Sequence, residues 1–204
     1  MGIGISQRIM KIREHTISLH GEKTSLRPLT ENDWDILLKW NNDPEVLYYA
    51  EGDNITSRDL PDIQNLYREV SQSAFCFMAE IDHAPIGECW LQQMNLISIF
   101  SKYPSMDCRR IDMLIGEKQY WGNGFGTEII GMLTRFGFET EKADFLFGCD
   151  IGDYNPRSMK AFKKNGYRLE SKIEQPYGCK ARFVYDLVLS KEEYRKRQQG
   201  KKGK

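Results

Sequence analysis

The sequence predicts one domain of the mixed α/β class, and three observations lead to this prediction. The chain has 204 residues, enough for one hydrophobic core and too few for two comfortable ones. Apolar residues make up 40% of the chain and charged residues 28%, which is typical of a globular protein rather than a disordered one. Segments with strand and helix patterns follow in the order β-α-α-β-β-β-α-β-α-β-β, as in a sheet covered by helices.

The first elements are a strand followed by two helices. A strand is expected over 24–28. Thr30 is a good N-cap residue, apolar residues follow it at helical spacing, and the pair Asp43-Pro44 is expected to end this helix. A second helix is expected over 57–70, because its apolar residues fall on one face.

The middle of the chain reads as three strands and a connecting loop. Strands are expected over 75–81 and 86–94, on either side of a turn at 82–85. Residues 96–108 have poor periodicity and are expected to form a loop. The apolar run 111–115 predicts a central strand.

The last part alternates helices and strands. A helix is expected over 127–138, a strand over 145–149 and a second helix over 156–165. Strands over 167–173 and 183–189 then close the sheet, the second with the alternation of a half-buried strand.

The chain is expected to divide into three parts, and charge sets the last one apart. We expect an N-terminal extension at 1–23, whose order the sequence does not set, a folded domain at 24–190 and a basic tail at 191–204 that frays. The tail carries seven basic and two acidic residues, so 22 basic and 27 acidic residues remain in the rest. An acidic domain favours a cationic small-molecule partner over a nucleic acid.

The cysteine and histidine patterns argue against a metal site. The five cysteines are scattered, odd in number and form no Cys-x-x-Cys pair, which favours reduced thiols in the cytoplasm. The three histidines lack metal-ligand spacing, so no metal is expected. No apolar run approaches the ~18–20 residues of a membrane helix, so no membrane partner is expected. The sequence leaves open whether the protein is a monomer or a homodimer.

The segment 120–128 carries three glycines at every second position, Gly122, Gly124 and Gly126, between the strand at 111–115 and the next helix. Glycine tolerates positive φ, and a helix start offers unpaired N–H groups and the positive end of its dipole. The segment therefore predicts an anion cradle suited to phosphates.

Three kinds of phosphate loop compete for this segment. A P-loop would need Gly-Lys-Ser/Thr, but Thr127 and Glu128 follow the last glycine, and the spacing does not fit the G-x-G-x-x-G of dinucleotide sites. The segment resembles the pyrophosphate loop of the GCN5-related N-acetyltransferases (GNAT), (Gln/Arg)-x-x-Gly-x-(Gly/Ala), with Trp121 at the first position. A plain glycine-rich turn is the alternative.

A second motif, 155–167, strengthens this resemblance. Asn155 and Pro156 are a good N-cap and first helical residue, and Gly166 suits a helix end, so an ordinary three-turn helix is one interpretation. The string also resembles the GNAT motif Asn-x-x-(Ala/Ser)-x-x-x-(Tyr/Phe)-x-Lys-x-Gly-Phe. In that family the asparagine contacts the pantetheine arm, and the helix lies beside the acyl-CoA.

The resemblance implies the GNAT fold, a mixed central sheet with a V-shaped splay between its two middle strands and flanking helices. Acetyl-CoA, the cosubstrate, sits in the V. The positions that the resemblance implies for its binding are Met113, Leu114, Ile115, Trp121, Gly122, Asn123, Gly124, Phe125, Gly126, Thr127, Asn155, Ser158, Phe162 and Lys164.

Asp112 is the outstanding carboxylate, because it alternates with apolar neighbours in the central strand, where an acid is costly unless paired or functional. A buried salt bridge to Arg109 or Arg110 is one explanation. The stretch 111–117 with the glycine loop resembles the aminoglycoside 6′-N-acetyltransferases, in which this aspartate is the catalytic base or amine anchor. The implied substrate-binding residues are Asp112, Asp150, Asp153 and Glu88, and the implied partner is a small polycationic amine.

Two departures from that branch bear on the mechanism. Phe162 stands where the branch usually has the tyrosine proposed to protonate the thiolate, and Tyr154 is the first candidate to replace it. A substrate-binding acid of the late turn is replaced around Tyr177. Three alternatives stay open: a ribosomal-protein-type N-terminal acetyltransferase, a siderophore-type N-acyltransferase, and a non-catalytic acyl-CoA-binding regulatory domain.

Overall fold

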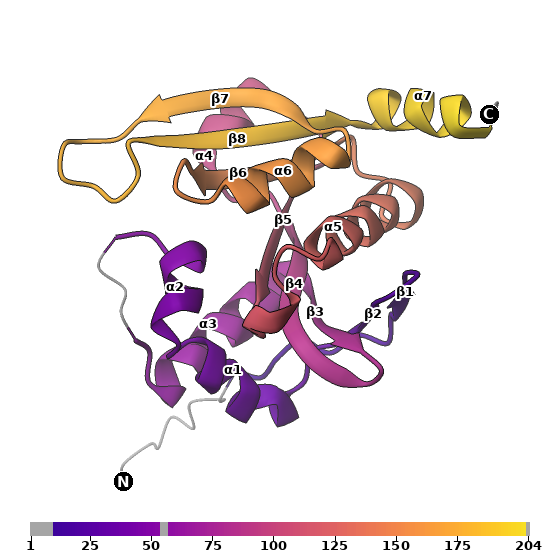
Figure 1. Cartoon of the computed structure of the whole chain (residues 1–204). Helices are drawn as coiled ribbons and strands as arrows, with labels where there is room; N and C mark the ends of the chain where they lie inside the picture. Colours follow the sequence, from indigo (N-terminus) through magenta and orange to yellow (C-terminus); the bar gives the residue numbers. More distant parts are fainter. Residues whose placement is uncertain (1–9, 54–56, 203–204) are drawn as a thin grey trace, which may run out of the picture.

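The computed structural model describes residues 10–53 and 57–202. They form one eight-stranded sheet with helices on both faces, in the strand order β1-β2-β3-β4-β5-β6-β8-β7 (Figure 1). The strands are β1 (Leu19–His20), β2 (Ser25–Pro28), β3 (Ala74–Ile81), β4 (Ala84–Gln93), β5 (Cys108–Ile115), β6 (Phe145–Gly152), β7 (Arg168–Glu174) and β8 (Phe183–Ser190).

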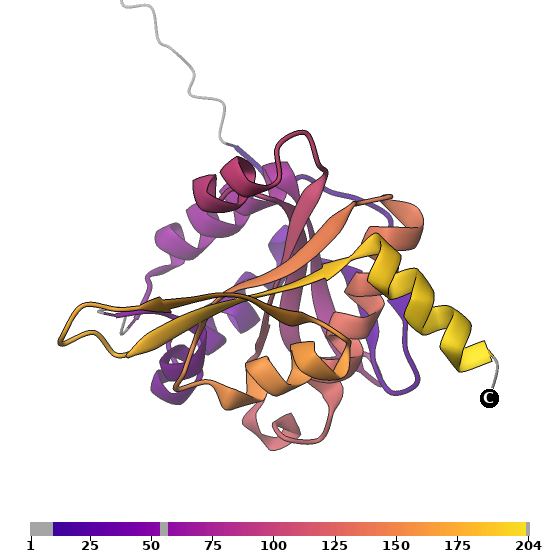
Figure 2. The same ribbon diagram turned by 90° about the horizontal axis from the view of Figure 1, so that it is seen from above.

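The helices cover the two faces of the sheet as separate groups. The α-helices are α1 (Trp34–Trp40), α2 (Pro44–Ala50), α3 (Leu60–Ser73), α4 (Ile97–Lys102), α5 (Phe125–Arg135), α6 (Pro156–Lys164) and α7 (Lys191–Lys202). Three short segments accompany them: the 3₁₀ turns η1 (Glu31–Asp33) and η2 (Lys118–Tyr120), and the π-helical η3 (Phe136–Thr140). Figure 2 shows α4 and α6 on opposite sides of the strands β6 to β8. None of the described helices has the length and apolarity of a membrane span.

The core has a main layer on each face. On one face, Ile130 and Leu133 of α5 and Phe162 of α6 pack with sheet residues such as Phe77 and Leu187. On the other face the side chains of α1 and α3 meet the sheet, with Leu37, Trp40, Ile63, Tyr67 and Met78 fully or almost fully buried. A smaller cluster lies under α4.

The sheet is antiparallel except where β5 meets β6. These two parallel strands pair at only three positions, from Cys108↔Phe145 to Arg110↔Phe147. Beyond them, 111–115 pairs only with β4 and 148–152 only with β8. The facing edges of the two strands therefore diverge, which confirms the predicted V-shaped splay. Figure 1 shows β6, β7 and β8 in the upper half of the molecule and β1 to β5 below.

The first helix, α1, ends at Trp40, before Asp43-Pro44 as expected, but the pair also begins a helix, α2, that was not predicted. The Asp43 carboxylate accepts hydrogen bonds from the N–H groups of Glu45 (2.9 Å) and Val46 (3.3 Å), and Pro44 occupies the first turn. An aspartate followed by proline can end one helix or cap the next, since both residues suit a helix start.

Two segments expected to be irregular are helical. The loop expected over 96–108 contains α4, a six-residue helix with one buried residue, Ile99, which is too short to give a periodic pattern. The tail expected to fray forms α7. A capping box begins it, because Ser190 N–H donates to the Glu193 carboxylate (2.9 Å) and Glu193 N–H donates to Ser190 Oγ (3.2 Å).

Part of the N-terminal extension is ordered against the domain. Ile12 is buried in the layer under α1 and α3, and β1 pairs with β2. The rest of the extension, residues 1–9, lies outside the described residues, as do residues 54–56 and 203–204.

Candidate active site

Two adjoining cavities lie where β5 and β6 diverge. The first, about 260 Å³, lies beside the glycine segment, and we call it the glycine-loop cavity. The second, about 310 Å³, contains Asp112 and Asp150, and we call it the carboxylate cavity. The same residues line both cavities at their junction: Tyr49, Ala50, Met113, Asn155 and Ser158.

The predicted cofactor-binding positions are brought together here, with one exception. Phe162 lines the carboxylate cavity, and Asn123 lines neither cavity, because its side-chain amide turns back and donates to the Gln119 carbonyl (3.2 Å). The remaining predicted positions all line the glycine-loop cavity: Met113, Leu114, Ile115, Trp121, Gly122, Gly124, Phe125, Gly126, Thr127, Asn155, Ser158 and Lys164.

The glycine segment presents backbone to the first cavity. Gly122 and Gly124 have φ values of +77° and +91°, and a Cβ built on either would meet no atom within 4 Å. Gly124 is the N-cap of α5, and no described side chain caps the first N–H groups of that helix. These donors and the helix dipole therefore remain available to an anion in the cavity.

The charges of this cavity have one sign. Arg157, Lys160 and Lys164 of α6 line it, and no acidic residue is among its described lining residues. Three cations and a helix start suit a ligand with several phosphate groups.

Trp121 stands at the position where the family loop has Gln or Arg. Its indole N–H donates to the Ile115 carbonyl (2.7 Å), which fixes the ring at the end of β5. Arg157 lies over the rings of Trp121 and Tyr49, which contact each other edge-on, with its Cζ 4.1 Å from each ring centroid. The indole thus holds a cation that α6 supplies. Arg157 and Tyr49 were not predicted, because Arg157 stands at a variable position of the second motif and Tyr49 lies outside both motifs.

Asn155 links α6 to α2 at the junction of the cavities. Its Oδ1 accepts from Ser158 N–H (3.2 Å), as expected of an N-cap, and its Nδ2 donates to the Tyr49 carbonyl (3.0 Å). The helix-cap interpretation is therefore confirmed. The contact with pantetheine stays a prediction.

Asp112 forms a salt bridge with Arg110, one of the two explanations considered for it, and the pair is partly buried, with 23% of the Asp112 side chain exposed. Arg110 donates to both of its carboxylate oxygens, at 2.7 Å from Nε and 2.8 Å from Nη2, and the Trp90 indole N–H adds a third bond at 3.1 Å. Burial acts to lower the pKa of Arg110, because it disfavours the charged form. The charge and hydrogen bonds of Asp112 have the larger combined effect, so the pKa of Arg110 lies above its ordinary value. Arg109 instead pairs with Asp107 and Glu141.

Asp150 reaches the same cavity from β6. It has a φ of +55° at an irregularity in the pairing of β6 with β8, and its N–H donates to the buried Asp186 carboxylate (3.0 Å). Its Oδ2 lies 4.0 Å from Arg110 Nη1. The Asp150 side chain is 58% exposed, and its partial desolvation in the cavity raises its pKa, although the charge of Arg110 acts in the opposite direction.

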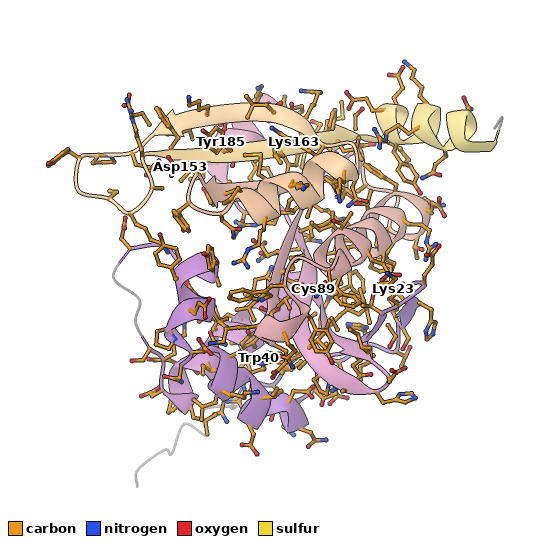
Figure 3. The ribbon with its side chains drawn as sticks, in the orientation of Figure 1. Lys23, Trp40, Cys89, Asp153, Lys163 and Tyr185 are labelled. Carbon is orange, nitrogen blue, oxygen red and sulfur yellow. The ribbon has the colours of Figure 1, made fainter. Side chains whose placement is uncertain are left out.

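The other two acids expected to bind substrate line neither cavity. Glu88 is 3% exposed and lies under the α1–α3 layer, where Oε2 has no hydrogen-bond partner among the described residues. Burial, followed by repulsion from Asp112, raises the pKa of Glu88 well above its ordinary value, which favours the neutral acid. Asp153 is exposed, accepts from Phe183 N–H (3.3 Å) and lies in the turn that joins β6 to α6 (Figure 3).

A lysine that was not predicted closes one side of the carboxylate cavity. Lys180, on the connection between β7 and β8, donates from Nζ to the carbonyls of Tyr48 and Glu51 at the end of α2, the latter at 3.1 Å. The same nitrogen lies 3.9 Å from the Tyr154 ring centroid, and the Tyr154 hydroxyl also donates to the Glu51 carbonyl (3.1 Å). Burial lowers the pKa of Lys180. No sequence pattern marked this contact, which joins segments about 130 residues apart.

Phe162 is buried between the cavity and the core. It is 3% exposed, meets the Tyr167 ring edge-on at 5.0 Å, and its ring tip approaches Gly148 so closely that a Cβ there would lie 2.5 Å from Cζ. Within 10–53 and 57–202, no group of three or more His, Cys, Asp or Glu residues is placed to hold a metal ion.

Two sequence relatives cover most of this chain. Aminoglycoside N(6′)-acetyltransferase type 1 of Serratia marcescens is 22% identical over 184 residues, which are 87% of this chain and 90% of that protein. The uncharacterized N-acetyltransferase p20 of Bacillus licheniformis is 25% identical over 187 residues, which are 87% of this chain and 98% of that protein.

Solved structures share the fold. The aminoglycoside acetyltransferase AAC(6′)-Ib, in complex with ribostamycin and coenzyme A, superimposes with a TM-score of 0.72 at 21% identity, covering 85% of this chain and 97% of its own. Spermidine N-acetyltransferase from Vibrio cholerae, in complex with CoA and spermine, gives 0.69 at 16% identity, covering 85% and 99%.

The family comparison agrees with the splayed sheet and the glycine loop. The sequence profile of the acetyltransferase (GNAT) domain matches residues 23–168, which include β2 to β6 and α6. The chain therefore belongs to the GNAT family and is an acetyl-CoA-dependent N-acetyltransferase.

Proposed function

We propose that this enzyme acetylates a primary amine of a small polycationic acceptor, and specifically the 6′-amine of an aminoglycoside. The observation that carries the proposal is the junction of the two cavities, because one is lined by cations and helix N–H groups and the other contains two carboxylates. An enzyme with this acceptor, acting in the cytoplasm, would confer resistance to the antibiotic.

The residues of the glycine-loop cavity fit acetyl-CoA, which supplies the acetyl group as a thioester. The N–H groups at the start of α5, with Lys160 and Lys164, would hold its phosphates, since a Cβ at Gly122 or Gly124 would enter the same space. The unpaired edges of β5 and β6 have backbone groups to offer the pantetheine arm.

Asp112 is the residue that we assign to the acceptor amine. It lies on β5 next to Met113, which lines both cavities, so an amine held by its carboxylate would lie near the junction. An ammonium group must lose a proton before it can attack a carbonyl, and a carboxylate at this place can accept that proton directly or through water. Asp150 would hold a second cation of the acceptor.

Release of the CoA thiol with a panel of amines tests the proposal. Kanamycin, which has a 6′-amine, should be acetylated, an aminoglycoside with a 6′-hydroxyl should not, and kcat/KM should fall as salt rises because charge attraction is screened. Equal turnover of both drugs would refute the 6′ regiochemistry. Turnover of peptides alone would assign the enzyme to protein N-terminal acetylation, and turnover of spermidine alone or of a hydroxylamine alone would assign it to polyamine or siderophore acylation.

A further inference from the structure

The carboxylate cavity already contains a cation that belongs to the protein. Arg110 lines it, and its side chain is only 14% exposed. The guanidinium makes two hydrogen bonds to Asp112, one to Asn95 Oδ1 (3.3 Å), and approaches Asp150 to 4.0 Å. It therefore lies between the two carboxylates that the proposed function gives to the acceptor.

This arrangement reduces both the free hydrogen-bonding capacity and the negative charge that the cavity offers to an incoming amine. Both oxygens of Asp112 are engaged by the guanidinium, and Trp90 adds a further donor to one of them. A planar guanidinium matches a carboxylate better than an ammonium does, because it donates two parallel bonds. The three groups together carry a net charge of −1 rather than the −2 of the two carboxylates alone.

We propose that Arg110 is a specificity-determining residue, an internal cation that occupies the ammonium subsite between Asp112 and Asp150 and that a cationic acceptor must displace. This inference rests on the proposed function. Only the fraction of molecules in which Arg110 has left Asp112 binds the acceptor productively, so its apparent affinity falls by that fraction. An acceptor with two ammonium groups can replace Arg110 at both carboxylates, whereas a monoamine replaces it at one, so the residue selects for polycations.

The neighbouring arginine provides the matched control. Arg109 lies on the same strand and is similarly buried, with an 11% exposed side chain, and it also pairs with two acids, Asp107 and Glu141. It lines neither cavity. Loss of Arg109 removes the same charge and a comparable salt bridge without touching the acceptor subsite.

The experiment compares Arg110→Met with Arg109→Met, using kanamycin as the probe. We measure kcat and KM by CoA thiol release, and the Kd of kanamycin by calorimetry. In Arg110→Met, KM and Kd should both fall on the order of tenfold, as expected when a competing state populated at about nine parts in ten is removed. The Kd of CoA should not change. Arg109→Met should leave the kanamycin constants unchanged. In Arg110→Met the gain in affinity should be larger for a monoamine than for kanamycin, because the selection for polycations is lost.

Each outcome decides the inference separately from the proposed function. An unchanged or higher Kd for kanamycin, in an Arg110→Met protein that still binds CoA, overturns the role of Arg110. If neither the wild type nor Arg110→Met acetylates kanamycin, the proposed function fails. Calorimetry still tests the role of Arg110, because tighter kanamycin binding by the variant supports it and absent binding overturns it. Should Arg110→Met fail to fold, Arg110→Gln, which keeps hydrogen-bond donors without the charge, must show the same tightening.

Discussion

The two cavities of this protein are built in different ways. Backbone and helix ends form much of the glycine-loop cavity, and most of its lining residues come from the stretches 113–127 and 155–164. The carboxylate cavity is formed by side chains from α2, β5, β6, α6 and the connection between β7 and β8. The first cavity is thus largely the product of two continuous segments, with α2 adding three residues, and the second depends on how the whole chain folds.

The cavities also differ in how their charges are used. The cations of α6 line the first cavity with no acid among its lining residues, so it is prepared for an anion before the ligand arrives. The charges of the second are partly satisfied within the protein, through Arg110 with Asp112 and Lys180 with the end of α2. The preformed first cavity suits acetyl-CoA. In the second cavity, on our proposal, an acceptor is selected by its ability to displace Arg110 from the carboxylates.

The largest effect is expected from a carboxylate placed in the glycine loop. In Gly124→Glu the side chain would enter the cavity beside the start of α5, where it blocks and repels phosphates. CoA binding should weaken on the order of 100-fold or more, because a like-charge contact costs several kcal/mol. Calorimetry with CoA measures the effect, and circular dichroism checks the fold.

Gly178→Glu is the matched control for this change. Gly178 has a φ of +93°, close to the +91° of Gly124, and a Cβ there also meets open space, but it lies outside both cavities. Both variants carry the same backbone strain. Undiminished CoA affinity in a folded Gly124→Glu protein would show that the phosphates bind elsewhere.

A smaller but still large effect is expected at the centre of the carboxylate cavity. Asp112→Asn keeps the size of the side chain and removes its charge and basicity, so kcat/KM should fall on the order of 10²–10⁴-fold. The steady-state rate of CoA release measures it. Asp107→Asn breaks an Asp–Arg pair at Arg109, outside the cavities, and should leave the rate unchanged. If Asp112→Asn keeps near-normal kcat/KM and only loses stability, Asp112 is a structural partner of Arg110.

The smallest effect on the rate is expected at Phe162, which lies between the carboxylate cavity and the core. Phe162→Tyr restores the hydroxyl usual in the aminoglycoside branch, and kcat should rise less than about threefold, or stay unchanged if product release limits the rate. An ordinary thiol has a pKa of about 8.5, so the CoA thiolate can leave without a protein acid. Stopped-flow measurement of the acetyl-transfer step separates chemistry from release.

Tyr154 provides the counter-test of this prediction. Its hydroxyl donates to the Glu51 carbonyl, so it is engaged in holding the end of α2. If Tyr154→Phe slows the transfer step strongly and adding Phe162→Tyr restores it, Tyr154 is the acid. If neither variant nor the double mutant changes that step, the proton comes from solvent or from the substrate.

The local parts of the molecule could be predicted from sequence. The glycine loop, the Asn155 cap and the succession of the strands β2 to β8 along the chain depend on neighbouring residues, and the resemblance to GNAT proteins added the splay. The short helices α2 and α4 could not, because seven and six residues give too little periodicity and Asp43-Pro44 fits a helix end as well as a start.

The acceptor side shows why long-range contacts resist prediction. Asp112 and Glu88 both look like acids in apolar strands, but their strands place one in a cavity and the other under a helical layer. Arg110 was one of two possible partners for Asp112. This contact is local and could have been predicted, because side chains alternate along β5 and residues 110 and 112 therefore share a face. Lys180 reaches α2 through a hairpin whose position depends on the whole sheet.

The three residue pairs between β5 and β6 have a consequence for the lifetime of the protein. This seam joins the strands β1 to β5 with the strands β6 to β8, and a ligand lying along it would contact both halves. A ligand that binds only the folded state at 100 times its Kd adds about 2.7 kcal/mol to the free energy of unfolding. We therefore expect partial opening and proteolysis to slow as acetyl-CoA becomes plentiful, so that the amount of enzyme in a cell follows the supply of its acetyl donor.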